Sequence, residues 1–175
     1  HFLYNVFNTI SASVPPQQEK TREMIAQLSD LFRYQLKASS SELVTLGEEL
    51  DFVTIYLELE KARFEDRLKI KIDVPENLRK EMIPPMILQP LIENSIKHGI
   101  SSLIKGGEVS IRIHKLNGVI YFEVADTGVG VEDKTNLFDK GIGLTNTKLR
   151  LEKIYGSEMI FSDNQPQGLK IQFAI

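Results

Sequence analysis

Three polar side chains in the middle of the sequence are spaced so that they could act together on a ligand. Asn94, Lys97 and His98 lie at i, i+3 and i+4 in the run LQPLIENSIKHG, and a helix places such residues on one face. An amide oxygen can ligate a hard metal ion such as Mg²⁺, and an ammonium group can meet phosphate as a point charge. The spacing predicts a face suited to a metal–nucleotide complex. His98 could touch phosphate there or serve as a hydrogen-bonded structural histidine.

A carboxylate and two glycines follow an apolar run further along the chain. Asp126 comes directly after VIYFEVA, and Gly128 and Gly130 follow it. A carboxylate accepts hydrogen bonds only, so Asp126 suits the exocyclic amino group of adenine and would repel the oxygen of guanine. The glycines allow positive φ and close approach of the backbone to a ligand. Taken alone, these residues also fit an ordinary Asp-x-Gly turn.

A second glycine pair opens a segment with helical character. Gly141, Gly143 and Leu144 lie in the run KGIGL, and the free N–H groups at the start of a helix could hold phosphate oxygens there. No Gly-Lys-Ser/Thr follows, so this is not a Walker A loop, and Asn146 stands where a dinucleotide fingerprint has its third glycine. In isolation, a loop that simply ends one segment and starts a helix is the better explanation of this pair.

The first third of the chain has a helical pattern. Apolar residues recur at steps of three and four over residues 2–67, which predicts helices that are separated at Pro15-Pro16. A third helix is expected to begin at Thr45, because Thr45 and Glu48 form the sequence signature of a capping box. We expect residues 1–66 to form a hairpin or bundle that completes its core against another copy of the chain.

The pattern changes after residue 67, where apolar and charged residues alternate. This alternation predicts a mixed α/β layer over residues 67–175. The two central strands should pair antiparallel, because only Leu116-Asn117-Gly118 separates them. The expected strands cover residues 68–74, 107–115, 118–126, 159–161 and 169–173, and the expected helices cover about 85–98 and 144–155.

Composition limits the classes of function. The 175 residues include 42% hydrophobic residues, enough for a core, and their formal net charge of −3 gives no electrostatic footprint for nucleic acid. No cysteine is present, which removes disulfides, cysteine-ligated zinc and thiol catalysis. The longest apolar stretch, residues 83–92, is broken by prolines and is too short to span a membrane. Because the chain starts at His1 without a methionine, we expect a piece of a longer protein whose membrane or sensor part lies upstream.

The order of the polar segments resembles a known nucleotide-binding fold. The Asn94 helix, the Asp-x-Gly-x-Gly strand end and the G-x-G helix start resemble the N, G1 and G2 boxes of the Bergerat-type ATP-binding fold. Histidine kinases, gyrase-type ATPases and certain chaperones share this fold. The resemblance covers residues 68–175 and implies an α/β sandwich that binds Mg-ATP, with Asn94 on Mg²⁺ and Asp126 on adenine. It also implies that four glycines line the nucleotide and its lid, namely Gly128, Gly130, Gly141 and Gly143.

One position separates the branches of that superfamily. Its hydrolytic members carry a glutamate four residues before the box asparagine, where it activates water, and this chain has Pro90 in that place. Proline has no ionisable group, so hydrolysis of the gyrase type is disfavoured. Glu93, directly before Asn94, points about a quarter-turn away along a helix. It is a candidate base acting across the contact between the two parts, or else a surface residue or one that touches the site residues without touching the ligand.

The first residues resemble a phosphoacceptor motif. HFLYNVFNTI, residues 1–10, is similar to the H box of the LytS-type sensor histidine kinases, and LSDLFRY at 28–34, RFEDRL at 63–68 and GIGLTN at 141–146 extend the likeness. The resemblance implies that His1 accepts phosphate and that Asn5 could position water for dephosphorylation of a partner. A remnant of a purification tag is the alternative for His1 considered alone.

The resemblance implies an α+β protein with two parts: residues 1–66 as a helical dimerisation and phosphoacceptor region, and residues 67–175 as an ATP-binding catalytic domain. It implies autophosphorylation with ATP and Mg²⁺, transfer to an aspartate of a response-regulator receiver domain, a homodimer, and a cytoplasmic portion of a membrane protein. Two rivals remain: a GHKL-type ATPase that hydrolyses ATP, and a non-catalytic nucleotide-binding dimerisation module.

Overall fold

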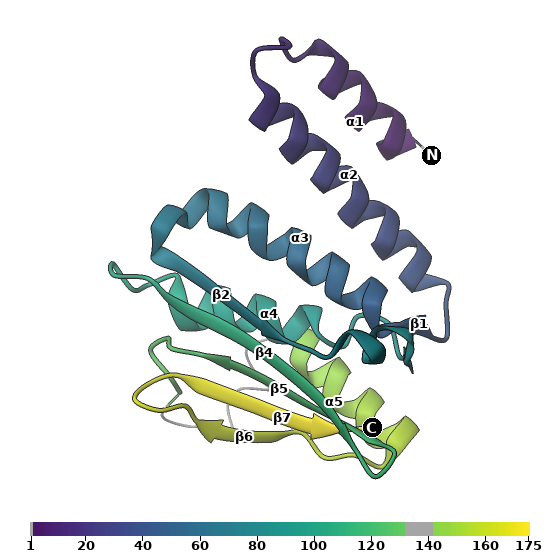
Figure 1. Ribbon diagram of the computed structural model, residues 1–175, viewed down its shortest axis with the longest axis vertical. Helices are drawn as coiled ribbons and strands as arrows, with labels where there is room; N and C mark the ends of the chain where they lie inside the picture. The colour runs from purple at the N-terminus through teal and green to yellow at the C-terminus, as the bar shows by residue number, and fades with distance from the viewer. Residues whose placement is uncertain (1, 132–141) are drawn as a thin grey trace.

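The computed structural model describes residues 2–131 and 142–175. A helical hairpin stands at one end, and helices cover one face of a sheet at the other (Figure 1). The helices are α1 (Phe2–Ser13), α2 (Glu19–Ser39), α3 (Leu46–Phe64), α4 (Gln89–Asn94) and α5 (Ile142–Tyr155), with the short helical segments η1 (Glu65–Arg67), η2 (Glu76–Lys80) and η3 (Ser95–Ile100). The strands are β1 (Val44–Thr45), β2 (Leu68–Asp73), β3 (Met82–Ile83), β4 (Gly107–Leu116), β5 (Val119–Asp126), β6 (Ile160–Asp163) and β7 (Leu169–Ala174).

The main sheet has five strands in the order β2-β4-β5-β7-β6. β2 runs parallel to β4, and the other neighbours are antiparallel. The predicted β4–β5 pairing is confirmed: Asn117 and Gly118 have φ values of 52° and 85°, as a two-residue hairpin turn requires. The α+β class is also confirmed. The small sheet of β1 and β3 was not predicted, because two-residue strands carry no periodicity.

The third helix begins as the capping signature predicts. The Thr45 side chain accepts from the Glu48 backbone N–H, and the Glu48 carboxylate accepts from the Thr45 N–H. The predicted apolar stripe of this helix is buried throughout: Leu46, Leu50, Val53, Leu57 and Phe64.

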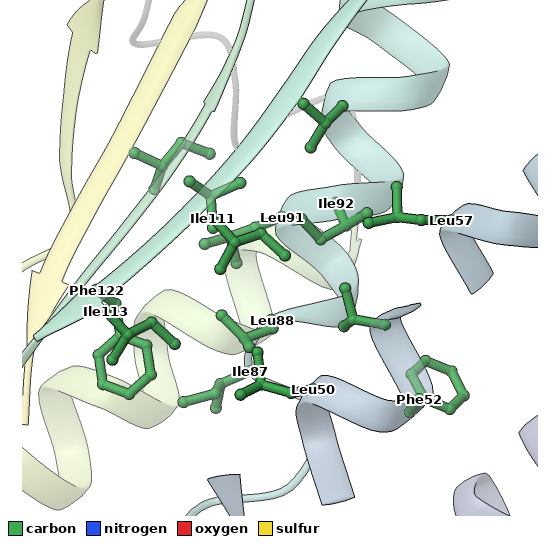
Figure 2. Packing of buried hydrophobic residues seen from close by; sticks show 14 of the residues in the cluster. Leu50, Phe52, Leu57, Ile87, Leu88, Leu91, Ile92, Ile111, Ile113 and Phe122 are labelled. Carbon is green, nitrogen blue, oxygen red and sulfur yellow. The ribbon is translucent and has the colours of Figure 1, made fainter. Parts of the chain in front are cut away.

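The chain itself covers the apolar stripe of α3. In Figure 2, Leu57 lies beside Ile92 of α4 and Leu50 lies beside Ile87, and all of them belong to one buried cluster with Phe122 of the sheet. The expectation that the whole first third completes its core against another copy is therefore wrong for α3. The predicted division between residues 66 and 67 passes through a core that both parts share. The physical reason is that α3 has an apolar face wide enough to bury against the α/β layer.

The hairpin of α1 and α2 is less covered. Its helices are separated at Pro15-Pro16 as predicted, and the Phe7 and Phe32 rings lie 5.4 Å apart. The carboxyl-terminal half of α2 packs on α3, whereas Ile10, Met24 and Leu28 are 43%, 37% and 37% exposed. Within residues 2–131 and 142–175, no helix is long and apolar enough to cross a membrane.

The helix that carries Asn94 differs from its predicted form. It was expected over about residues 85–98, but α4 begins at Gln89, because Met86 adopts a left-handed φ of 57°. After Asn94 the hydrogen bonding changes to the wider i→i+5 pattern of η3, as in the 2.9 Å bond from Ser101 N to Ile96 O. Lys97 and His98 thus lie on a π-helical segment, so the ideal α-helical spacing predicted for them is wrong.

The capping box should contribute measurably to stability. Thr45→Ala removes the acceptor of the Glu48 N–H, and we expect the free energy of unfolding to fall by about 1 kcal/mol. Urea unfolding followed by circular dichroism measures this change. Thr54→Ala on the exposed side of α3 is the control, expected within about 0.5 kcal/mol of the parent. Equal losses in the two variants would contradict the assignment.

Candidate functional site

The end of the Asn94 helix lies against the end of β5. A Cβ added to Gly99 would come within 2.8 Å of Asp126 Oδ1, and the Val129 N–H donates to Gly99 O over 3.0 Å. Asp126 itself is 1% exposed. Two of the segments that the sequence singled out are therefore in direct contact.

Asp126 is a buried carboxylate with most of its donors from the backbone. Oδ1 accepts from the N–H groups of Gly128 over 2.9 Å and Leu169 over 3.3 Å, and the buried Ser95 side chain also forms a hydrogen bond to the carboxylate. Burial raises the pKa of Asp126, and these hydrogen bonds partly oppose the rise. Because both backbone bonds end on Oδ1, the carboxylate keeps acceptor capacity on Oδ2.

The glycines after Asp126 have different structural roles. A Cβ on Gly128 would lie 2.3 Å from the carbonyl carbon of Gly99, so glycine is required here for contact with the chain's own backbone. Gly130 has a φ of 74°, which confirms the positive φ expected at this position. The predicted close approach of the backbone is thus present at Gly128, but its partner in the structure is Gly99.

Gly143, from the second glycine pair, lies at the other end of α4. A Cβ on Gly143 would come within 3.2 Å of Pro90 Cβ, so the start of α5 contacts the start of α4. The Leu144 side chain is buried in the core, which leaves its backbone as the part that could meet phosphate. Gly141 lies outside the described residues.

The polar residues Asn94, Lys97 and His98 lie between these two contacts along the chain. Asn94 is the last residue of α4 and is partly exposed, and Lys97 and His98 are exposed on η3. One continuous helix therefore touches Gly143 with its first turn and Asp126 with its last. The three polar side chains project from the stretch between, where a charged ligand could reach them.

Glu93 lies beside α3. The Gln89 side-chain amide donates to its Oε1 over 2.6 Å. Burial raises the pKa of Tyr56, with the negative charges of Glu60 and Glu93 contributing, so the Glu93 carboxylate is close to this part of α3. A role for Glu93 as a base stays a prediction.

The segment that resembles a phosphoacceptor motif is described only in part. His1 lies outside the described residues. Asn5 is exposed on α1, and its carbonyl oxygen accepts from the Thr9 hydroxyl over 2.9 Å. Asn8 is also exposed, and Phe7 is half-buried. Ile10 is exposed in this single chain.

Sequence reasoning missed several residues around Asp126. Gly168 has a φ of 119°, and a Cβ there would come within 1.9 Å of Asp126 O, to which Asn164 Nδ2 also donates over 2.8 Å. Like Ser95 and Gly99, these residues gave no signal, since their roles come from contacts between distant segments.

Glu49 was also missed, although the sequence does carry a signal for it. This carboxylate is 0% exposed. It lies three residues after Leu46 and four before Val53, within the apolar stripe of a helix, where a charge requires partners.

Comparison with known proteins agrees with this geometry. Residues 1–68 match the family described as histidine kinase. Residues 81–175 match the family described as histidine kinase-, DNA gyrase B-, and HSP90-like ATPase. A histidine kinase domain from the Erythrobacter litoralis EL346 blue-light activated histidine kinase has the same fold, with a TM-score of 0.59 and 16% identity, covering 87% of this chain and 72% of that chain.

Curated relatives are more similar in sequence. The sensor histidine kinase BtsS of Escherichia coli is 38% identical over 150 residues, which cover 86% of this chain and 27% of BtsS. The sensor protein LytS of Bacillus cereus is 33% identical over 187 aligned positions, which cover all of this chain and 32% of LytS. The chain thus spans about a third or less of these relatives. It belongs to the histidine kinase-, DNA gyrase B- and HSP90-like ATPase family, and the predicted likeness to LytS-type sensor histidine kinases is confirmed.

Proposed function

We propose that this chain is the kinase core of a two-component sensor, which phosphorylates its own His1 from ATP and passes the phosphoryl group to an aspartate of a receiver domain. The observation that carries the proposal is the continuous helix of α4 and η3. It contacts Gly143 at its start and Asp126 at its end, and it presents Asn94, Lys97 and His98 between them. The family assignment supports the same function.

The residues present suit ATP. Asp126 offers a buried acceptor for the adenine amino group, and a buried hydrogen-bonding site of this kind discriminates strongly against a base that offers an oxygen. Lys97 is exposed to meet phosphate oxygens, and the backbone around Gly141, Gly143 and Leu144 is proposed to line them. Asn94 supplies the amide oxygen for Mg²⁺, which when bound would offset phosphate charge.

The proposed reaction is a direct transfer to imidazole. A neutral ring nitrogen of His1 forms a bond to the γ-phosphorus, the bond from that phosphorus to the bridging oxygen breaks, and ADP leaves with the electron pair. Much of the imidazole is uncharged near neutral pH, because its reference pKa is about 6.5. Phe2 follows His1 and cannot accept the imidazole proton, so Glu93 is proposed as the base.

Pro90 favours the protein acceptor over water. It lies at the first turn of α4 and faces Gly143, where it offers no group that could activate water. A hydrolysing ATPase is the weaker alternative for this reason.

The assembly and location of the whole protein are part of the proposal. Exposed apolar side chains on the α1–α2 hairpin, including Ile10, Met24 and Leu28, are proposed to pair with a second copy, since such side chains gain free energy when they leave water. The partner is a receiver domain, and the chain is proposed to be the cytoplasmic portion of a membrane-bound sensor.

Labelling with ATP tests the main proposal. In a protein extended by at least one helical turn before His1, incubation with γ-labelled ATP and Mg²⁺ should give an acid-labile, base-stable phosphate on His1, lost in His1→Ala. A label that survives acid would contradict the proposal. Steady phosphate release that His1→Ala leaves unchanged would favour the hydrolysing ATPase.

A substitution at Asn5 should affect phosphatase activity without affecting kinase activity. The exposed side chain lies one turn beyond His1 and is proposed to orient water on the phosphorylated receiver. Asn5→Ala should retain autophosphorylation within about twofold and lose at least about tenfold in receiver dephosphorylation. Exposed Asn8, changed to Ala, is the matched control. Undiminished phosphatase activity in Asn5→Ala would refute the role.

Nucleoside binding should weaken as the pH falls. Burial raises the pKa of Asp126, and the ionised carboxylate accepts the adenine amino hydrogen more strongly than the neutral acid does. Affinity should therefore decline as Asp126 takes up a proton, by at most about tenfold per pH unit below that pKa.

Adenosine, which has no titrating phosphate, is the suitable ligand for this pH test, followed by NMR titration as the pH is lowered from neutral over the range in which the protein stays folded. Inosine lacks the amino donor and should bind weakly throughout. Equal binding of the two nucleosides would contradict the role of Asp126, and failure of Mg-ATP to bind at all would favour a non-catalytic module.

A further inference from the structure

Glu49 is a fully buried carboxylate that the proposed reaction does not use. It lies in the first turn of α3 with no exposed surface. A charge in such a place is costly unless hydrogen bonds and opposite charges surround it. The partners of Glu49 therefore indicate what the fold gains from it.

Its first partners are backbone groups at the start of the Asn94 helix. Oε1 accepts from the N–H groups of Leu88 over 2.9 Å and Gln89 over 3.4 Å, and Oε2 accepts from Met86 N–H over 2.8 Å. Helix starts leave such N–H groups without partners and favour negative charge. Glu49 thus holds the chain where α4 begins.

The conformation of Met86 shows how firmly this segment is held. Its φ of 57° is unfavourable for a residue with a side chain. Such a conformation persists where surrounding contacts determine it. The bond from Met86 N–H to Glu49 is one of these contacts, and it sets the direction in which the chain enters α4.

The next partner of Glu49 comes from the phosphoacceptor hairpin. The Tyr34 hydroxyl on α2 donates to Glu49 Oε2, and the Tyr34 ring lies 4.8 Å from that of Phe52 on α3. Burial and the charge of Glu49 raise the pKa of Tyr34, so the hydroxyl stays protonated and remains a donor. One carboxylate oxygen therefore bonds both to α2 and to the segment before α4.

A cation on α5 completes the surroundings. The guanidinium of Arg150 is half-buried, burial lowers its pKa, and the negative charge of Glu49 opposes this shift. Arg150 Nε is buried and has no hydrogen-bond partner among the described residues. Arg150 thus provides positive charge near Glu49 from the helix that starts at the second glycine pair.

From these contacts we infer that Glu49 is a positioning residue that fixes the Asn94 helix relative to the phosphoacceptor hairpin, with Tyr34 as its link to α2. The inference rests on the proposed kinase function for its consequence, which is the alignment of His1 with ATP. The bonds from the N–H groups of Met86, Leu88 and Gln89 to Glu49 orient the Asn94 helix, which carries the proposed nucleotide site. The bond from the Tyr34 hydroxyl to Glu49 orients the α1–α2 hairpin.

Tyr34→Phe tests this link, because it keeps the ring against Phe52 and removes only the hydroxyl. We expect kcat of autophosphorylation to fall by about tenfold, the effect of losing one hydrogen bond to a charged group. The KM for ATP should stay within about twofold, because the backbone bonds of Glu49 are weakened and not removed. Tyr121→Phe, at an exposed position on β5, is the matched control and should leave both constants unchanged.

A measurement without nucleotide separates this inference from the proposed function. Glu49→Gln keeps the shape of the side chain but puts an amide nitrogen in place of one oxygen. Amide hydrogen exchange at residues 86–89 should become faster in Glu49→Gln and in Tyr34→Phe, and should not change in Tyr121→Phe.

The possible outcomes are distinct. Parental exchange at residues 86–89 in Glu49→Gln, a parental kcat in Tyr34→Phe, or equal losses of kcat and ATP affinity in Tyr34→Phe would overturn the inference. Faster exchange in both variants, in a protein whose parent never labels His1, would support the positioning role and reject the kinase function.

Discussion

The arrangement of this protein depends on a buried negative charge at the start of the Asn94 helix. Glu49 accepts hydrogen bonds from the N–H groups of Met86, Leu88 and Gln89 and from the Tyr34 hydroxyl. A carboxylate can accept several bonds at once, so one side chain joins α2, α3 and α4. The free-energy cost of burying the Glu49 charge is offset only while these hydrogen-bond partners stay in place. This requirement favours one arrangement of α2, α3 and α4 over others.

A second constraint acts at the other end of the same helix, where backbones meet without side chains between them. A Cβ on Gly128 would lie 2.3 Å from the Gly99 carbonyl carbon, one on Gly99 would lie 2.8 Å from Asp126 Oδ1, and one on Gly168 would lie 1.9 Å from Asp126 O. This packing excludes water from the Asp126 carboxylate and directs backbone donors to its Oδ1. A buried carboxylate that still has acceptor capacity discriminates between nucleotide bases more strongly than a carboxylate exposed to water does.

The two constraints give α3 a role that its sequence did not suggest. Its apolar stripe packs on α4 and faces the sheet (Figure 2), while Glu49 on the same helix bonds to α2 and to the start of α4. The helix is therefore part of the ATPase core as well as the support of the hairpin. In the proposed kinase, α3 is the element through which the phosphoacceptor and nucleotide halves keep a defined geometry.

Elements with a local cause could be predicted from the amino-acid sequence alone. The Thr45 capping box, the break at Pro15-Pro16, the Asn117-Gly118 hairpin and the order of Asn94, Asp126 and Gly143 could all be predicted, because periodicity, turn chemistry and motif spacing are properties of neighbouring residues. Only the tertiary structure decided where α4 begins, that η3 is π-helical, and that Glu49 and Gly168 support the site. These features arise from contacts between residues far apart in the chain, and such contacts leave no periodic signal in the sequence.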